Sequence, residues 1–182
     1  MNQNPLASTM SDVLTTEEIP CDGNEGAIAM VTINRPNKLN SLNQEVMNEI
    51  KKMCSWAESN EKIRCVIITG AKPLPPPEGK RQKPNAFVAG ADITEFIGQK
   101  GDDIRALFKD NGWEAIWNLS KPTIAMIDGF TLGGGLEVAC SCDMRVNAGS
   151  QLRARGILGA SNERARKRAL AGGCLREGRG ET

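Results

Sequence analysis

One stretch, Lys121–Val146, constrains the fold of this 182-residue chain more than any other. It reads KPTIAMIDGFTLGGGLEVACSCDMRV. The apolar run Thr123–Ile127 has the length and branching of a buried strand, and an Asp-Gly pair ends it. Three glycines, Gly133–Gly135, then precede Leu136–Cys140, which we interpret as a short helix. Because a glycine inside a helix costs about 1 kcal/mol relative to alanine, glycines at this helix start need a reason.

Such a start offers hydrogen-bond donors to a ligand. The N–H groups of a first helical turn have no partner within the helix, and glycine leaves them uncovered at the positive end of the helix dipole. Glu137 follows Gly134 by three residues and returns to the same helix face, among apolar neighbours. A carboxylate there must be paired, hydrogen-bonded or raised in pKa, which suits acid–base chemistry beside an oxyanion site. The alternative is a tight helix–sheet contact with Glu137 facing solvent.

The amino-acid composition excludes several classes of site. Histidine and tyrosine are absent. This excludes Ser-His-Asp and Cys-His nucleophilic sites and every His-ligated metal, so acid–base work falls to Asp, Glu, Lys or Cys. The six cysteines have no CxxC spacing. We therefore expect no metal site, and we expect a reducing compartment such as the cytosol.

Charge and hydropathy argue against two classes of partner. The net charge is +1, and no apolar stretch approaches the ~20 residues needed to cross a membrane. The N-terminus lacks the basic start and apolar run of a secretory signal. We expect neither a nucleic-acid nor a membrane partner, and a cytoplasmic protein, with an organellar matrix left open.

The first half of the chain is predicted to alternate strands and helices. Residues 1–24 are polar and irregular, which predicts a flexible N-terminal arm. Ala27–Ile33 is typical of a strand, and apolar residues at three- and four-residue intervals predict a helix over Asn43–Ser59. Arg64–Thr69 is apolar enough for a strand buried on both faces.

Two capping patterns mark helix starts. Ser41 with Gln44 forms a capping-box pattern before the first helix. Asp92 and Glu95 have the same spacing, so Asp92 can be explained as a cap alone. Asp103–Leu119 is predicted as a second amphipathic helix, with its two tryptophans in the core.

A proline-rich insertion at residues 71–85 separates two predicted strands. It reads AKPLPPPEGKRQKPN, with five prolines and four Lys or Arg residues. This composition predicts a solvated, partly extended loop. Its PLPPP run also suits a ligand of a polyproline-binding domain, although surface loops commonly collect prolines.

The character of the sequence changes after about Gly149. Residues 151–182 carry eight Lys or Arg against three Glu, with scattered glycines and little apolar periodicity. Three interpretations stay open for this basic tail, residues 150–182: a disordered arm, an RNA-binding segment, or a segment whose reading frame has changed. No aromatic residue is interleaved, which disfavours base stacking and specific nucleic-acid binding.

Three motifs carry a family resemblance. They are INRPNKLNSLN at Ile33–Asn43, AFVAGADITEF at Ala86–Phe96, and the stretch Lys121–Val146. In this order they resemble the enoyl-CoA hydratase/isomerase family, the crotonase superfamily. The order of predicted elements alone indicates only an α/β fold. The resemblance implies a crotonase-like spiral of ββα repeats over residues 25–149, with an incomplete C-terminal part.

The resemblance also implies residue roles. The backbone N–H groups of Ala91 and Gly134 would form an oxyanion hole for the thioester oxygen of an acyl-CoA, and Glu137 would be the general acid/base. No metal or redox cofactor is implied, since coenzyme A arrives as part of the substrate. The residues that correspond to CoA-holding segments are Lys38, Leu39, Ala89, Gly90, Ala91, Asp92, Ile93 and Gly133.

The implied activity is hydration of a 2-enoyl-CoA in fatty-acid and acyl-CoA metabolism. Family hydratases use a second glutamate in a Gln-Pro-Glu-like motif, which this sequence lacks; Glu163 lies in a different context. The C-terminal helices that complete the site and make the family's homo-oligomer contacts are also missing. An enoyl-CoA isomerase, which can use one carboxylate, and a truncated inactive family member are the alternatives.

Overall fold

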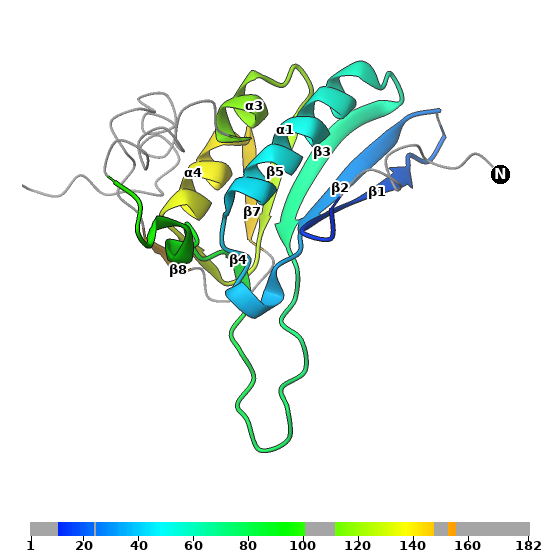
Figure 1. Cartoon of the computed structure of the whole chain (residues 1–182). Coiled ribbons are helices and arrows are strands. Elements are labelled where there is room, and N and C mark those ends of the chain that lie inside the picture. Colours follow the sequence, from blue (N-terminus) through cyan, green and yellow to red (C-terminus); the bar gives the residue numbers. More distant parts are fainter. Residues whose placement is uncertain (1–10, 24, 101–111, 148–152, 156–182) are drawn as a thin grey trace, which may run out of the picture.

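The structure is a computed structural model that describes residues 11–23, 25–100, 112–147 and 153–155. Pairs of consecutive strands are followed by helices along the chain, which confirms the predicted α/β class (Figure 1). The strands are β1 (Leu14–Pro20), β2 (Ala27–Ile33), β3 (Ile63–Gly70), β4 (Ala86–Val88), β5 (Thr123–Ile127), β6 (Phe130–Leu132), β7 (Met144–Asn147) and β8 (Arg153–Arg155). The helices are α1 (Gln44–Ser59), α3 (Gly112–Asn118) and α4 (Gly134–Ser141), with 3-10 helices η1 (Pro36–Lys38) and η2 (Ile93–Phe96).

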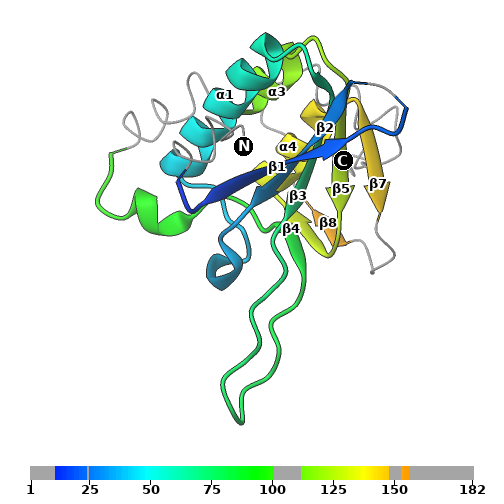
Figure 2. The same ribbon diagram turned by 90° about the vertical axis from the view of Figure 1, so that its right-hand side faces the viewer.

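A five-stranded sheet in the order β1-β2-β3-β5-β7 forms the centre of the fold. Strands β2, β3, β5 and β7 are parallel, and β1 pairs antiparallel with β2. In β2 every second residue is buried, because successive side chains point to opposite faces of a sheet. Helices α1, α3 and α4 lie along one face of this sheet, as Figure 1 and Figure 2 show.

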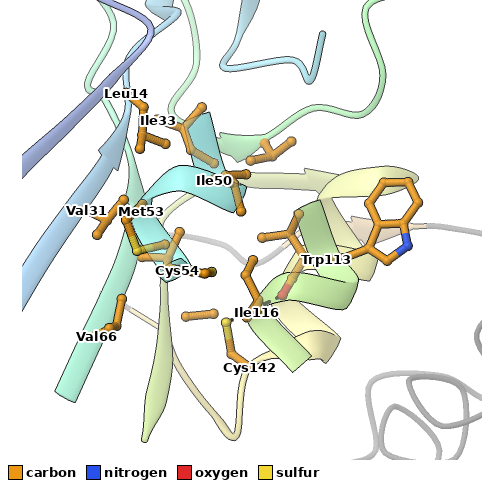
Figure 3. Packing of buried hydrophobic residues seen from close by; sticks show 14 of the residues in the cluster. Leu14, Val31, Ile33, Ile50, Met53, Cys54, Val66, Trp113, Ile116 and Cys142 are labelled. Atoms are coloured by element: carbon orange, nitrogen blue, oxygen red, sulfur yellow. Dashed lines mark hydrogen bonds between the residues drawn. The ribbon is translucent and has the colours of Figure 1, made fainter. Parts of the chain in front are cut away.

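The hydrophobic core lies between this sheet and the helices. The apolar side chains that α1 buries recur at helical spacing, as the sequence predicts; they are Val46, Met47, Ile50, Met53, Cys54 and Ala57. Leu14, Val31 and Ile33 belong to the same cluster from the sheet side (Figure 3). Trp113 and Ile116 join it from α3. The core therefore ties α1, whose first turn borders the candidate site, to both the sheet and α3.

β4, β6 and β8 form a second, short parallel sheet in the order β4-β6-β8. The sequence did not predict β6, because it has only three residues between an Asp-Gly turn and the three glycines. Strand β8 lies within residues 150–182 and pairs with β6. Part of the basic tail therefore extends the α/β fold, whereas residues 156–182 lie outside the described part of the chain.

The prediction of a flexible arm over residues 1–24 was wrong for Leu14–Pro20. These residues form β1, which pairs with β2 along its whole length. Leu14 is fully buried, while most of the remaining side chains of β1 are exposed or half-buried. The segment is polar because an edge strand buries little of its surface, so its composition resembles that of a loop. Residues 1–10 and 24 lie outside the described residues.

The start of α1 differs from the predicted capping box. Helix α1 begins at Gln44, and its cap is Asn43, whose Oδ1 accepts a hydrogen bond from Val46 N at 3.0 Å. Ser41 is not the cap. Leu42 forms an isolated parallel β-bridge with the turn after β4, so the chain is still extended there. This long-range pairing delays the helix, and the local pattern could not reveal it.

The other predicted elements are found close to their predicted bounds. Of the helix predicted over Asp103–Leu119, the structure describes Gly112–Asn118 as α3, and residues 101–111 lie outside the described residues. The insertion at residues 71–85 contains no helix or strand, as predicted.

Candidate active site

A cavity of about 220 Å³ lies between the start of α1, the turn after β4 and the start of α4. Four residues that the sequence singled out line it: Ala91, Gly133, Gly134 and Glu137. They come from two segments far apart in the chain, and the parallel pairing of β4 with β6 brings those segments together. The structure therefore joins the predicted oxyanion donors and the predicted acid/base in one cavity.

The N–H group of Ala91 is directed away from the chain segment that precedes α1. Leu42 N donates to Gly90 O at 2.8 Å, and Asp92 N donates to Leu42 O at 2.7 Å. In such a parallel bridge, the residue between the two bonded neighbours directs its own N–H to the opposite side. Among the described residues the Ala91 N–H has no hydrogen-bond partner, so it can serve a ligand.

The N–H group of Gly134 is the first of α4. The N-cap Gly133 has φ 49° and ψ −120°, a conformation that residues with a side chain rarely adopt. The Gly133 carbonyl accepts hydrogen bonds from Leu136 N at 2.9 Å and Glu137 N at 3.2 Å. The Gly134 N–H precedes these donors and has no partner within the helix, which leaves it at the positive end of the helix dipole.

Gly135 explains why the third residue of the run is also glycine. A Cβ at this position would lie 2.1 Å from the Val88 carbonyl oxygen and 2.8 Å from Val88 Cβ. The start of α4 therefore rests directly on β4, the strand that leads into the turn with Ala91. The predicted tight helix–sheet contact exists at Gly135, and it places the helix start beside the cavity.

Glu137 lies half-buried on the first turn of α4 and lines the cavity. Its neighbours around the cavity include the apolar side chains of Leu42, Met47, Phe96 and Trp113. The alternative of a solvent-facing Glu137 is therefore not favoured by the structure. A carboxylate beside uncovered N–H donors in apolar surroundings can exchange a proton with a bound molecule.

Glu95 is a second carboxylate that lines the cavity. The sequence pairs it with Asp92 as a capping pattern, but its two oxygens lie 3.2 and 3.0 Å from Gln44 N, which donates to them. Glu95 thus satisfies a donor in the first turn of α1. Asp92 does cap η2, since its Oδ1 accepts from Thr94 N at 3.2 Å.

The two segments predicted to hold CoA meet beside the cavity. Ala89 N donates to Leu39 O at 3.1 Å, which joins the loop before α1 to the turn after β4. The side chain of Lys38 is 52% exposed, and Ile93 is 74% exposed. Six residues predicted to hold CoA do not belong to the cavity lining: Lys38, Leu39, Ala89, Gly90, Asp92 and Ile93.

Asn40, which the sequence analysis did not single out, holds this loop in place. It is 1% exposed and adopts the left-handed conformation, with φ 57°. Its Nδ2 donates to Ala71 O at 2.9 Å and to Ala86 O at 2.8 Å, and its Oδ1 accepts from Arg35 N at 3.0 Å. Asparagine tolerates this backbone better than most residues, so an Asn in a turn was the available signal.

Replacing Asn40 with alanine should lower the free energy of unfolding by about 3 kcal/mol. The change leaves one N–H and two carbonyl groups without partners and places a Cβ residue at positive φ. Asn40→Gly is the matched control, because it loses the same hydrogen bonds without backbone strain. Urea denaturation should place Asn40→Gly about 1 kcal/mol above Asn40→Ala. Wild-type stability in both variants would contradict this role.

Asp92 forms a buried ion pair with Arg35. Arg35 Nη2 donates to Asp92 Oδ2 at 2.8 Å, and Arg35 Nη1 donates to Ser41 O at 2.7 Å. The Thr94 hydroxyl also donates to Asp92 Oδ1, at 2.7 Å. The hydrogen bonds from Thr94 and Arg35 lower the pKa of Asp92 to about 2. Asp92 therefore stabilises the loop beside the cavity as a carboxylate.

The ion pair between Asp92 and Arg35 should make the free energy of unfolding depend on pH in the acidic range. Because folding lowers the pKa of Asp92 from 3.8 to about 2, its contribution is complete above about pH 4 and is lost as pH falls toward 2. Asp92→Asn should lose about 2 kcal/mol at pH 7. The difference from wild type should shrink between pH 4 and pH 2, as denaturant melts across that range would show. A difference that stays constant with pH would contradict the assignment.

No cysteine in the described part of the chain belongs to the cavity lining. No group of three or more His, Cys, Asp or Glu side chains among the described residues could hold a metal ion. Burial raises the pKa of the Cys54 and Cys142 thiols to about 12, so both stay protonated and unreactive. Among the same residues no helix is long and apolar enough to cross a membrane.

Comparison with known proteins decides the family. The sequence profile of a family described as enoyl-CoA hydratase/isomerase matches residues 23–152. The chain belongs to the enoyl-CoA hydratase/isomerase family. This enoyl-CoA hydratase/isomerase family member is 38% identical over 124 residues to a short-chain-enoyl-CoA hydratase of Clostridium acetobutylicum, covering 67% of the chain and 43% of that protein.

A second relative and two solved structures extend the comparison. The mitochondrial methylglutaconyl-CoA hydratase of Rattus norvegicus is 35% identical over 157 residues, which cover 80% of this chain and 44% of that one. An enoyl-CoA hydratase/carnithine racemase from Magnetospirillum magneticum superposes with a TM-score of 0.70 at 27% identity, covering 87% of this chain and 57% of that one. An enoyl-CoA hydratase from Bacillus anthracis gives 0.62 at 27% identity, covering 78% and 50%.

These likenesses confirm the predicted crotonase-like fold for this family member. The chain spans less than half the length of the curated relatives named above. The roles of individual residues, the cytoplasmic location and the state of oligomerisation stay predictions.

Proposed function

We propose that this family member binds an acyl-CoA thioester, stabilises its enolate and adds water to a 2-enoyl-CoA. The observation that carries the proposal is the meeting of Ala91, Gly134 and Glu137 around one cavity. Two N–H groups that have no hydrogen-bond partner among the described residues can hold one thioester oxygen. A carboxylate beside them can move the proton. Preorganised donors of this kind each contribute about 3 kcal/mol toward a transition state.

The proposed hydration balances with one carboxylate. Glu137 takes a proton from water as the water oxygen bonds to C3 of the enoyl group. The electron pair of the C2–C3 double bond forms the C1–C2 double bond of the enolate, and the carbonyl pair moves onto the thioester oxygen, where the Ala91 and Gly134 N–H groups stabilise the negative charge. The protonated Glu137 then returns a proton to C2, so that one water has been added across the double bond.

A second candidate is isomerisation of an enoyl-CoA. Among the described residues, Glu95 and Glu137 are the carboxylates that line the cavity. The Glu95 carboxylate already accepts hydrogen bonds from Gln44 N at the start of α1, which favours a reaction in which one carboxylate moves the proton. One carboxylate suffices to remove a proton from C2 of a 3-enoyl-CoA and return it to C4, through a dienolate whose oxygen the same two N–H groups would hold.

A thermal melt followed by two assays tests the proposal. Crotonyl-CoA at a hundred times its dissociation constant should stabilise the chain by about 2.7 kcal/mol. Loss of the enoyl absorbance would then report hydration, and deuterium incorporation at C2 and C4 without hydration would report isomerisation. A melt that ignores crotonyl-CoA, with neither reaction detected, would support the inactive alternative and reject the proposal.

A further inference from the structure

Residues 71–85 are a structured feature that the proposed chemistry does not use. They leave the end of β3, extend away from both sheets and return to β4 (Figure 1 and Figure 2). None of them lines the candidate active-site cavity. Residues 74–84 are all exposed, so the insertion adds nothing to the core. We call residues 71–85 the proline loop.

Backbone hydrogen bonds hold the base of the proline loop. At its start, Ala71 N donates to Ile33 O at 2.9 Å. At its end, Asn85 O accepts from Phe130 N at 3.0 Å. The first bond joins the loop to the end of β2, and the second joins it to β6. The loop therefore leaves the body of the protein at two fixed points.

Side-chain contacts join the two legs of the proline loop to each other and join the return leg to η1. Gln82 Nε2 donates to Leu74 O at 3.1 Å, and Lys83 Nζ donates to Asn37 O at 2.9 Å. The turn at the tip contains Gly79, with φ +74°. These contacts restrict the shapes that the loop can take. A loop that is already ordered loses less entropy when a partner binds.

The outgoing leg has the chemistry of a polyproline ligand. Its residues Pro73, Leu74, Pro75, Pro76 and Pro77 contain the spacing Pro-x-x-Pro. Proline fixes φ near the polyproline II value and disfavours helix in the residue before it. Since that helix has three residues per turn, Leu74 and Pro77 lie on one edge, and Pro73 and Pro76 lie on the neighbouring edge. Leu74 is 56% exposed and Pro76 is also exposed, so the two edges together present an apolar surface.

The return leg adds positive charge. Lys80, Arg81 and Lys83 line a hollow of about 260 Å³ together with Leu74–Pro77 of the outgoing leg. Glu78 is the single acidic residue of the loop. A partner that receives the proline run would therefore gain from acidic side chains next to its groove. Aromatic-lined grooves of SH3, WW and EVH1 domains recognise such runs, because the extended helix is already formed.

We propose that the proline loop is a docking element that inserts Pro73–Pro77 into the aromatic groove of a polyproline-binding domain with acidic residues at its rim. Leu74 and Pro76 provide the apolar contacts, and Lys80 and Arg81 pair with the acidic rim. The interaction is independent of catalysis, since the loop lies outside the active-site cavity.

Titration of the purified chain against an array of SH3, WW and EVH1 domains tests the proposal. At least one domain with an acidic rim should bind, as followed by NMR shifts of the domain's groove residues. The double change Leu74→Ala with Pro76→Ala should weaken that binding about tenfold or more. Pro84→Ala is the matched control, because it removes an exposed proline of the same loop outside the run. It should change the affinity less than about twofold.

Circular dichroism melts of all variants should coincide with wild type, because the substituted side chains are exposed. Absence of binding across the array would overturn the proposal. If Pro84→Ala weakened binding as much as the double change Leu74→Ala with Pro76→Ala, the proposal would also be overturned. If Lys80→Glu with Arg81→Glu abolished binding while Leu74→Ala with Pro76→Ala did not, the loop would be a charge contact, and the polyproline mode would be rejected.

Discussion

Replacing Glu137 with glutamine should lower the rate of enoyl-CoA turnover by about 10²–10⁴-fold. Glutamine keeps the shape of the side chain but cannot accept and return a proton. Glu137 is half-buried beside apolar side chains. Because glutamine is nearly the same size as glutamate, the change removes the negative charge there without adding bulk. Stopped-flow hydration and exchange of the C2 proton should both fall, while the affinity for crotonyl-CoA stays within a few-fold of wild type.

Glu45→Gln is a suitable control for this experiment. Glu45 lies exposed in the first turn of α1, near the cavity but outside its lining. Glu45→Gln changes the net charge by the same amount as Glu137→Gln. If long-range electrostatics alone set the rate, the two variants would therefore have equal turnover rates. A Glu137→Gln variant as active as Glu45→Gln would refute the role of Glu137 in proton transfer.

Replacing Gly134 with proline should reduce turnover by about 10²–10³-fold by deleting one oxyanion donor. Proline lacks the N–H group, yet it is well accepted at the first position of a helix. Because Gly133 already adopts a glycine-only conformation, it can precede proline with less restriction than other residues. The effect should appear in kcat more than in the binding of crotonyl-CoA.

Gly134→Ala separates the missing donor from the added bulk. A Cβ at this position would lie 3.1 Å from Leu42 Cδ1, the end of a flexible side chain that can move. Alanine keeps the N–H group, so its activity should stay within about tenfold of wild type. If alanine and proline reduced kcat equally, sterics would explain the loss, and the oxyanion role of Gly134 would be wrong.

Much of the fold could be predicted from local pattern. The alternation of β2 and the three-to-four spacing in α1 follow from burial of one face, and both predictions were confirmed. Strand β1 could not be predicted, because its polar residues reflect an edge position that exists only after β2 has folded. The cap of α1 is Asn43 and not the predicted Ser41 for a similar reason, since Leu42 pairs with a segment far along the chain.

Some residues of the candidate site could be identified from local sequence signals, whereas others depend on contacts between distant segments. Glycines at a helix start and a glutamate one turn later are local signals, so Gly134 and Glu137 could be identified from their spacing. Glu95 could not be placed, because its partner Gln44 lies 51 positions away. Trp113 was expected only as a core residue, yet it also lines the cavity. Its double role depends on how α3 packs beside α1.

The sequence by itself determined the residue types available for chemistry and the family: no histidine, one glutamate behind three glycines, and motifs in the order of a known family. Those properties are carried by residue type and by spacing along the chain. The tertiary structure alone decided that the Ala91 N–H is directed away from its bridge to Leu42, and that Asn40 holds the adjoining loop. Hydrogen bonds between distant segments set both features, and such bonds leave no periodic trace in the sequence.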